Sequence, residues 1–458
     1  MFRAVFYSLL VHSRYMRKFK FSDLNNKHFL ALAGNAVISV LSVVTIGLLY
    51  RSLGKADVGT WFFFLSILSL GDALRNGLLS TATVKFYAGT TAGRAEEVLG
   101  SVWYLATALT FLMFLIDAGG MLFIPVITNP LLITSIQWFG VTLLSTLPTT
   151  VIFWILVADE QYGKILWLRL VNSGSMILVI AALIFLKKMT IDSLLWCNLL
   201  TNILTCLVGF VLRLARLKTI TSRSKACVSE ILHFGKYSLG TSAASKLLQS
   251  TDVYIVTFML GPAAVAVYNL PLRLMEIIEI PLRTFVGTGM SAMASAYNNK
   301  NIRQASYILS KYAGMLTMAF IPLTIMSFFF ADLAIYILGG SKYIATEAAN
   351  ILRIFMIISL MYPADRFNGV GLDIVHKPKI NFYKVLIMLA VNIAGDFVGI
   401  YFLKSMYGAA LSSFLTVLSG LLFGYFQLRK YMEFSFRAIL MEGYIETKLL
   451  LLKTLGKG

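Results

Sequence analysis

About twelve long apolar stretches constrain the fold of this 458-residue chain more than any motif does. A helix needs about 20 apolar residues to cross a bilayer. Hydrophobic residues make up 58% of the chain and charged residues 13%, with a mean hydropathy of +0.79, so we predict an all-α polytopic membrane protein. The predicted spans are centred on residues 28–50, 58–80, 98–118, 132–157, 165–186, 191–212, 237–260, 265–292, 310–331, 347–370, 381–403 and 407–428.

The flanking charges predict how these spans are threaded. If both termini are cytoplasmic, the inward segments hold 28 Lys and Arg residues, including Lys377, Lys379 and Lys384, and the outward loops hold six. This asymmetry is a strong positive-inside pattern. Anionic membrane lipids are the expected partner of a chain with a net charge of +19, and no nucleic acid is needed to explain that charge.

The chain repeats itself with an offset of 207 residues. The segment Leu53–Trp61 recurs as Leu260–Tyr268, with Leu, Gly, Val, a small residue and an aromatic residue in register. The same offset aligns two polar sets, each spaced to occupy one helix face: Asn35, Ser39, Ser42 and Thr45 in the first, and Ser242, Lys246, Gln249 and Asp252 in the second. We interpret these faces as the two sides of a central cavity, although gene duplication alone would also preserve them.

Six helices per half give both halves the same orientation in the membrane, so the expected architecture is two six-helix lobes related by a parallel repeat. The two ends of the chain read as amphipathic segments on the membrane surface. The predicted divisions are a cytoplasmic basic interfacial segment (1–27), an N-lobe (28–212), a cytoplasmic linker (213–236), a C-lobe (237–428) and a cytoplasmic amphipathic tail (429–458).

Charged residues inside the spans are the candidates for function. An ionised side chain at the bilayer centre costs about 2.5 to 3.5 kcal/mol on insertion scales and usually faces a partner or water. The eighth predicted span carries a stripe of four charges. Arg273, Glu276 and Glu279 lie between Pro271 and Pro281, and Arg283 follows two residues after the second proline. The stripe either pairs internally as a packing network, Arg273 with Glu276 and Arg283 with Glu279, or lines a polar cavity with Lys246 and Asp252.

Other charges within spans are more scattered. Asp72 and Arg75 lie near the repeat equivalents of Glu279 and Arg283, and Asp365 and Arg366 lie in the tenth span. Asp117 stands alone in its span. Asp396 is interpreted either as a proton or ion site or as a partner in a helix-pair hydrogen bond.

Neither metal nor catalytic chemistry is indicated. Cys197, Cys206 and Cys227 lack metal-ligand spacing, and the four histidines belong to no zinc or nucleophile motif. No connection between spans exceeds about 25 residues, which leaves no room for a catalytic domain outside the membrane. We therefore predict a protein that is not an enzyme and that uses no metal and no cofactor.

Several of these features resemble the polysaccharide-export flippases, which are the O-antigen and exopolysaccharide transporters of the multidrug/oligosaccharidyl-lipid/polysaccharide exporter superfamily. The resemblance covers residues 25–430 and includes the two six-helix lobes. The residues that carry it are the Leu53–Trp61 segment, Phe234-Gly235-Lys236 before the seventh span, Asp252, Gly261 and Tyr268.

The resemblance implies a flippase that moves a polyprenyl-pyrophosphate-linked oligosaccharide from the cytoplasmic to the outer leaflet of a bacterial inner (plasma) membrane by alternating access. Besides this lipid-linked oligosaccharide, other polysaccharide assembly proteins are the implied partners. The implied pyrophosphate ligands are Arg75, Lys246, Arg273, Arg283 and Arg366, with Asp252, Glu276 and Glu279 orienting them or binding sugar hydroxyls. Seven acids against six bases in the spans mean that such a site need not be net positive.

One alternative belongs to the same superfamily: an ion-coupled multidrug or cation extruder. That class is expected to use an acidic residue in an N-lobe helix for ion coupling. The first span here offers only Asn35 and hydroxyl groups, which favours the flippase.

Overall fold

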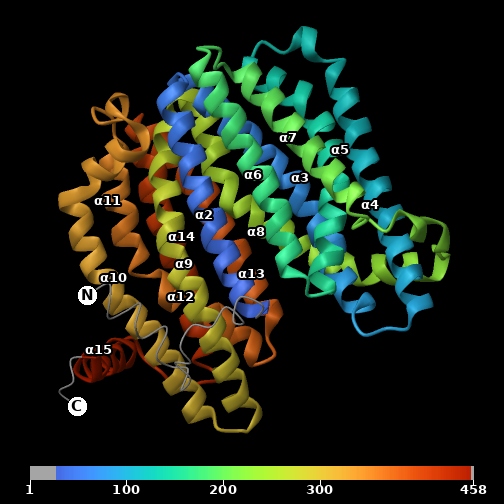
Figure 1. The fold of residues 1–458 in the computed structure, drawn as a ribbon. Coiled ribbons are helices and arrows are strands. Elements are labelled where there is room, and N and C mark those ends of the chain that lie inside the picture. Colours follow the sequence, from blue (N-terminus) through green and yellow to red (C-terminus); the bar gives the residue numbers. More distant parts are fainter. Residues whose placement is uncertain (1–26, 455–458) are drawn as a thin grey trace. The chain divides into compact units, whose positions relative to one another are not determined.

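The computed structural model describes residues 27–454, and all regular structure within that range is helical (Figure 1). The predicted basic segment at residues 1–27 lies almost entirely outside the described residues. In chain order the helices are α2 (Lys27–Ser52), α3 (Lys55–Tyr87), α4 (Ala92–Met121), η2 (Ile124–Val126), α5 (Pro130–Ala158), α6 (Tyr162–Phe185), α7 (Ile191–Val211), η3 (Leu217–Ser222), α8 (Lys225–Leu260), α9 (Pro262–Asn298), α10 (Ile302–Gly339), η4 (Ser341–Tyr343), α11 (Ala348–Ser359), α12 (Tyr362–Ile374), α13 (Pro378–Leu403), α14 (Tyr407–Leu428) and α15 (Phe436–Thr454).

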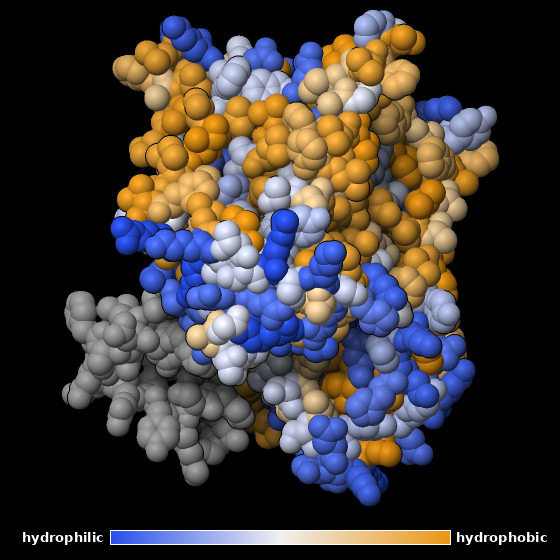
Figure 2. Space-filling view, turned by 90° about the vertical axis from the view of Figure 1, so that its right-hand side faces the viewer, coloured by the Kyte–Doolittle hydropathy of each residue, from blue (hydrophilic) through white to orange (hydrophobic). Residues whose placement is uncertain are grey.

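Each predicted span coincides with a helix, or with the bent pair α11 and α12. Eight of the described helices are long and apolar enough to cross a membrane, and the pair, bent by 46°, makes a ninth. Helices α8 and α9, with 36 and 37 residues, are long enough but carry the charges noted in the seventh and eighth spans. Figure 2 shows hydrophobic residues over much of one face, with hydrophilic residues gathered towards its lower end. The predicted all-α polytopic fold is confirmed.

Local sequence signals explain where several helices begin and break. The Asn129 side chain accepts the backbone N–H of Leu131 and so caps α5, whose first residue is Pro130. Thr190 and Ser193 form a capping box at the start of α7. Pro363 lacks the N–H that would continue the α11 ladder, and the chain bends just before it.

The seventh helix begins earlier than the sequence suggested. Helix α8 starts at Lys225, because the Ser224 hydroxyl accepts the backbone N–H of Cys227 at 3.1 Å and caps it. The stretch predicted as the linker, 213–236, therefore contains η3 and the first three turns of α8.

The described chain forms two compact units. The N-terminal unit runs from α2 to Val267 and includes residues 338–340, while the C-terminal unit holds Tyr268 to Ile337 and the chain from Ser341 onwards. Each unit has its own apolar core. Because α8 packs with the N-terminal unit, this division falls later than the predicted linker; the predicted lobe boundaries remain a prediction.

The two copies of the sequence repeat meet inside the N-terminal unit. The Tyr50 hydroxyl donates to the backbone oxygen of Ala266 at 3.0 Å. A Cβ at Gly59 would lie 1.7 Å from the backbone oxygen of Pro262, so only glycine allows this approach. The repeated turns thus end α2 and α8 at matching positions and also pack against each other.

Small residues bring the most closely packed helix pairs together, as is common in membrane proteins. In the C-terminal unit α13 and α14 touch backbone to backbone at Gly399 and Gly408. In the N-terminal unit α3 packs along α8, where a Cβ at Gly235 would meet the backbone oxygen of Leu78.

Candidate functional site

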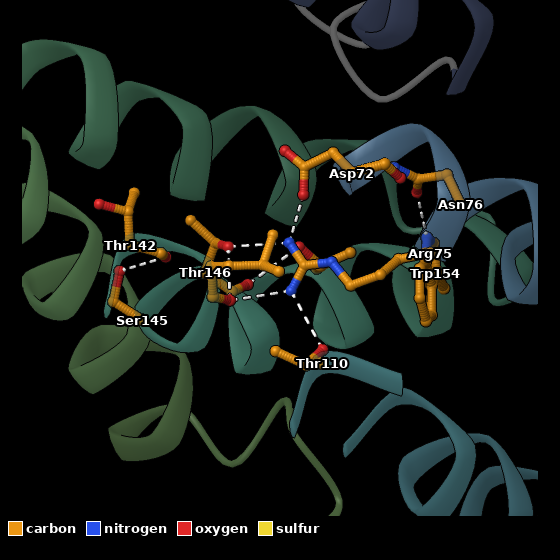
Figure 3. A network of polar contacts seen from close by, with 10 residues as sticks. Asp72, Arg75, Asn76, Thr110, Thr142, Ser145, Thr146 and Trp154 are labelled. Carbon is orange, nitrogen blue, oxygen red and sulfur yellow. Dashed lines mark hydrogen bonds and ion pairs between the residues drawn. The ribbon is translucent and has the colours of Figure 1, made fainter. Parts of the chain in front are cut away.

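Arg75 is the centre of a polar network that joins three helices of the N-terminal unit (Figure 3). It projects from α3 and is fully buried. Its guanidinium donates to the backbone oxygen of Leu143 at 2.9 Å and to the Thr146 hydroxyl at 2.8 Å, both on α5, to the Thr110 hydroxyl of α4 at 3.4 Å, and to the Asp72 carboxylate of its own helix.

The Asp72 carboxylate is the part of this network that is accessible from outside. The Asp72 side chain is 36% exposed, whereas Arg75 is not exposed at all. Beside them the Trp154 indole N–H donates to the Asn76 side chain at 2.7 Å. Arg75, predicted as a substrate ligand, therefore lies where it can position Asp72 and tie α3 to α4 and α5.

The polar face predicted for the seventh span lies on α8. Lys246 and Asp252 are both half-buried, and each interacts with other groups of the chain. Their repeat equivalents on α2 are Ser39 and Thr45, and the Thr45 hydroxyl donates back to the backbone oxygen of Leu41 at 2.9 Å.

The charged stripe of α9 forms two ion pairs. Arg273 contacts Glu276 at 2.6 Å, and Arg283 contacts Glu279 at 2.6 Å. These are the partners expected under the packing interpretation, but the stripe is not buried as a packing network would be: the Arg283 side chain is 74% exposed and that of Glu276 51%.

The tenth span divides its two charges between opposite environments. Arg366 on α12 is exposed, and no partner for it is found among residues 27–454. Its neighbour Asp365 is buried and pairs with Lys384 of α13, whose ammonium lies 2.5 Å from the carboxylate and donates to the Asp365 backbone oxygen at 2.9 Å. The sequence counted Lys384 with the inward flanking cations; the structure shows it almost fully enclosed between helices.

Lys384 begins a buried stripe along α13 that the sequence analysis missed. The buried residues of this helix recur every fourth position, which places them on one face: Lys384, Met388, Asn392, Asp396 and Ile400. This face packs against α14, where the Ser412 hydroxyl donates to the backbone oxygen of Asn392 at 3.2 Å. The spacing of the polar residues Lys384, Asn392 and Asp396, by eight and four residues, was the available signal.

The two isolated acids differ in their surroundings. Asp117 of α4 accepts the backbone N–H of Gly140 of α5 at 2.9 Å, which is a helix-pair hydrogen bond. Asp396 is fully buried and belongs to the α13 stripe. Both interpretations of Asp396, as an ion or proton site and as a helix-pair contact, remain predictions.

The fold is that of membrane transporters already known in structure. It matches an inward-facing conformation of a multidrug resistance MATE family transporter of the MOP superfamily, with a TM-score of 0.71, 14% identity, and coverage of 87% of this chain and 98% of that one. It also matches the lipid II flippase MurJ in an inward closed conformation, with a TM-score of 0.70, 16% identity, and coverage of 94% and 93%. A MOP superfamily transporter from Pyrococcus furiosus matches with a TM-score of 0.60, 16% identity, and coverage of 87% and 94%.

Comparison with family models by sequence alone detects similarity in part of the chain. The MatE family model matches residues 238–398, which run from α8 into α13. No curated protein matches the sequence. At 14 to 16% identity the structural likenesses establish the fold, a two-lobed transporter architecture of about twelve helices that MATE transporters share with MurJ.

Proposed function

We propose that this protein is a flippase that moves a polyprenyl-pyrophosphate-linked oligosaccharide, an O-antigen or exopolysaccharide repeat unit, from the cytoplasmic to the outer leaflet by alternating access. The observation that carries the proposal is the charged stripe of α9. Arg283 is 74% exposed and, among the described residues, bonds only Glu279. A guanidinium has five N–H donors, so this pair leaves donors that a phosphate oxygen can accept.

The stripe offers phosphate partners at two depths. Arg273 and Arg283 are ten residues apart on one helix, which corresponds to about 15 Å along the axis. That distance is about half the thickness of the hydrocarbon core. The acids Glu276 and Glu279 hold the guanidinium groups in place between substrates, and they accept sugar hydroxyls when a phosphate replaces them at the arginines.

The charge of the substrate also suits the direction of transport. In a cell that is negative inside, outward movement of each negative charge is favoured by about 2.3 kcal/mol per 100 mV. The fold match to a protein described as a lipid II flippase supports the same substrate class.

The second candidate is an ion-coupled multidrug or cation extruder. The fold matches to multidrug resistance MATE transporters favour it. An extruder needs a carboxylate to couple an ion. The first span, where an N-lobe acid is expected, has none, so the residue that would serve in this chain is the buried Asp396 beside Asn392 on α13, in the C-terminal unit. In that case the ion pairs of the α9 stripe would not bind the substrate.

Complementation of a flippase-null bacterium that makes the cognate glycan tests the proposal. We expect the wild-type chain to restore surface polysaccharide, and the Arg273→Gln/Arg283→Gln double variant to lower export at least about tenfold at matched membrane expression, because two charge-assisted phosphate contacts are lost. Arg283→Lys keeps the charge but loses the fork geometry and should fall between them.

A matched control and two contrary outcomes make the experiment decisive. Arg303→Gln removes an exposed cation at the start of α10 and should leave export unchanged. Export that survives in the double variant would exclude the α9 arginines as phosphate ligands. A wild-type chain that restores no polysaccharide but lowers ethidium accumulation, in a manner abolished by Asp396→Asn, would establish the extruder instead.

A further inference from the structure

A groove of about 740 Å³ lies on the N-terminal unit, where α4, the chain after η3 and the first turns of α8 come together. Its volume is within the range of small-molecule sites. Its lining includes Tyr104, Arg223, Lys225, Leu232, His233 and Lys236. No acidic residue lines it within the part of the chain that the structure describes. We call this feature the Arg223 groove.

The walls of the Arg223 groove are held firmly in place. The Trp103 indole on α4 donates to the backbone oxygen of Ala215 at 3.0 Å. A Cβ at Gly100 would lie 2.1 Å from the backbone oxygen of Thr219 and 3.0 Å from the backbone nitrogen of Arg223, so η3 rests directly on α4. The chain between α7 and α8 is therefore an anchored wall and not a loose connection.

Nearby acids do not cancel the positive charge of the groove. Arg94 pairs with Glu97 at 2.7 Å and also with Glu230, and the Ser224 hydroxyl donates to Glu97. These contacts occupy both carboxylates at the edge of the site. The Arg223 guanidinium instead lies over the ring of Tyr104, 4.5 Å from its centre, and Lys225 is exposed.

An apolar stripe leads away from the groove along α4. Tyr104, Phe111 and Leu115 are exposed and spaced by seven and four residues, so they lie on one helix face. Leu112 and Ile116 widen the stripe. Helix α4 is among those long and apolar enough to span a membrane, and exposed apolar side chains of such a helix face acyl chains.

We propose that the Arg223 groove binds one anionic phospholipid, with its phosphate on Arg223 and Lys225 and an acyl chain along the Tyr104, Phe111 and Leu115 stripe. Charge complementarity selects an anionic headgroup, and the adjoining apolar stripe selects a lipid over a free phosphate or an acidic peptide. Leu232 covers the glycerol region from α8. The site is independent of the transported substrate proposed above.

Native mass spectrometry of the full chain in detergent, titrated with phosphatidylglycerol, tests this site. We expect one tightly bound lipid in the wild type. A charge-assisted hydrogen bond to the phosphate is worth about tenfold in affinity, so Arg223→Gln/Lys225→Gln, which removes two cations, should weaken the tight binding at least about tenfold. Lys187→Gln/Lys188→Gln removes two exposed cations between α6 and α7 and should leave it unchanged.

Two further ligands distinguish the sources of the phosphate. Phosphatidylethanolamine should bind weakly, and equally to the wild type and to the Arg223→Gln/Lys225→Gln variant, called the Arg223 variant below. Glycerol phosphate should not displace the bound lipid. Equal phosphatidylglycerol binding by the wild type and the Arg223 variant, or equal losses in both double variants, would overturn the proposal. Displacement by glycerol phosphate would overturn the lipid assignment.

An unchanged thermal unfolding midpoint in the absence of lipid establishes that the Arg223 variant is folded. If the double variant does not fold, the single variant Lys225→Gln replaces it. Among the described residues, no hydrogen bond or ion pair of the Lys225 side chain holds the groove walls, and retention of full lipid affinity in Lys225→Gln would then count against the site.

Discussion

At the scale of single residues, the buried cations of the described chain position other groups and do not themselves face a ligand. Arg75 and Lys384 are both enclosed, and each is paired with a carboxylate on the same or the neighbouring helix. Removing one member of a buried pair leaves the other without compensation, which is costly. Both residues therefore act first through the structure of their own unit.

Replacing Arg75 with Lys tests that role. Lysine keeps the charge and has three N–H donors, but these radiate from one atom and cannot reproduce the fork in which two guanidinium nitrogens reach Asp72, Thr146 and the Leu143 oxygen. We expect Arg75→Lys to lower the free energy of unfolding by about 1 to 3 kcal/mol, measured as a lower unfolding temperature in detergent. Arg303→Lys, at an exposed site, should change nothing. A stable Arg75→Lys protein that has lost export would instead make Arg75 a substrate ligand.

The residue types at these sites could be predicted from the sequence, but not their environments. The spacing of Arg273, Glu276, Glu279 and Arg283 identified the ion pairs of α9. The same reasoning placed Lys384 with the flanking cations, because hydropathy locates the end of a span only to within several residues. Lys384 is buried because it pairs with Asp365 on the preceding helix, α12. A pattern within one segment of sequence does not show which side chains of two helices come into contact.

At the scale of helices, α15 is fixed to α10 by one close backbone approach. A Cβ at Gly314 would lie 2.0 Å from the backbone oxygen of Ile439 and 2.7 Å from the Cα of Gly443. Beside this contact Glu446 pairs with Lys311 at 2.5 Å and accepts the Tyr307 hydroxyl. The predicted amphipathic tail is thus a docked helix.

Gly314→Val should undock α15, because its side chain collides with backbone that cannot rotate away. We expect trypsin to cut the tail at Arg437 or Lys448 several-fold faster than in the wild type, read by gel electrophoresis over time. Gly287→Val is the matched control, since a Cβ at that position of α9 has no atom within 4 Å. Equal cleavage of the two variants would mean that α15 is held by other contacts.

Helices were more predictable than their ends. Each predicted span coincides with a helix or with the pair α11 and α12, because a membrane requires a long and mainly apolar segment. The start of α8 was missed by about three turns, since Ser224 was not identified as its cap. The bend between α11 and α12 follows from Pro363, which the span pattern ignored.

At the scale of the whole molecule, the distribution of charge predicts an orientation that can be measured directly. In a variant without native cysteines, we expect single cysteines replacing Lys188 or Lys404 to react with a membrane-impermeant maleimide in intact spheroplasts. Cysteines replacing Arg303 or Lys379 should react only after permeabilisation, as the positive-inside pattern requires. Because Cys197, Cys206 and Cys227 are buried, their replacement by Ala or Ser need not disturb the surface.

Reaction at Arg303 in intact spheroplasts would reverse the predicted topology. It would also put the Arg223 groove in the outer leaflet, because two predicted spans lie between Arg223 and Arg303 and an even number of spans leaves both positions on the same side of the membrane. The measurement therefore bears on the orientation of every site described above.

The packing of α8 along α3 has a consequence for the order in which the chain is made. Synthesis proceeds at about 5 to 20 residues per second, so the stretch between Tyr87 and Lys225 takes roughly 7 to 28 s to emerge. During that time the face of α3 around Leu78 has no α8 to meet. We therefore expect this face of α3 to stay uncovered in the first six spans until the seventh has been synthesised.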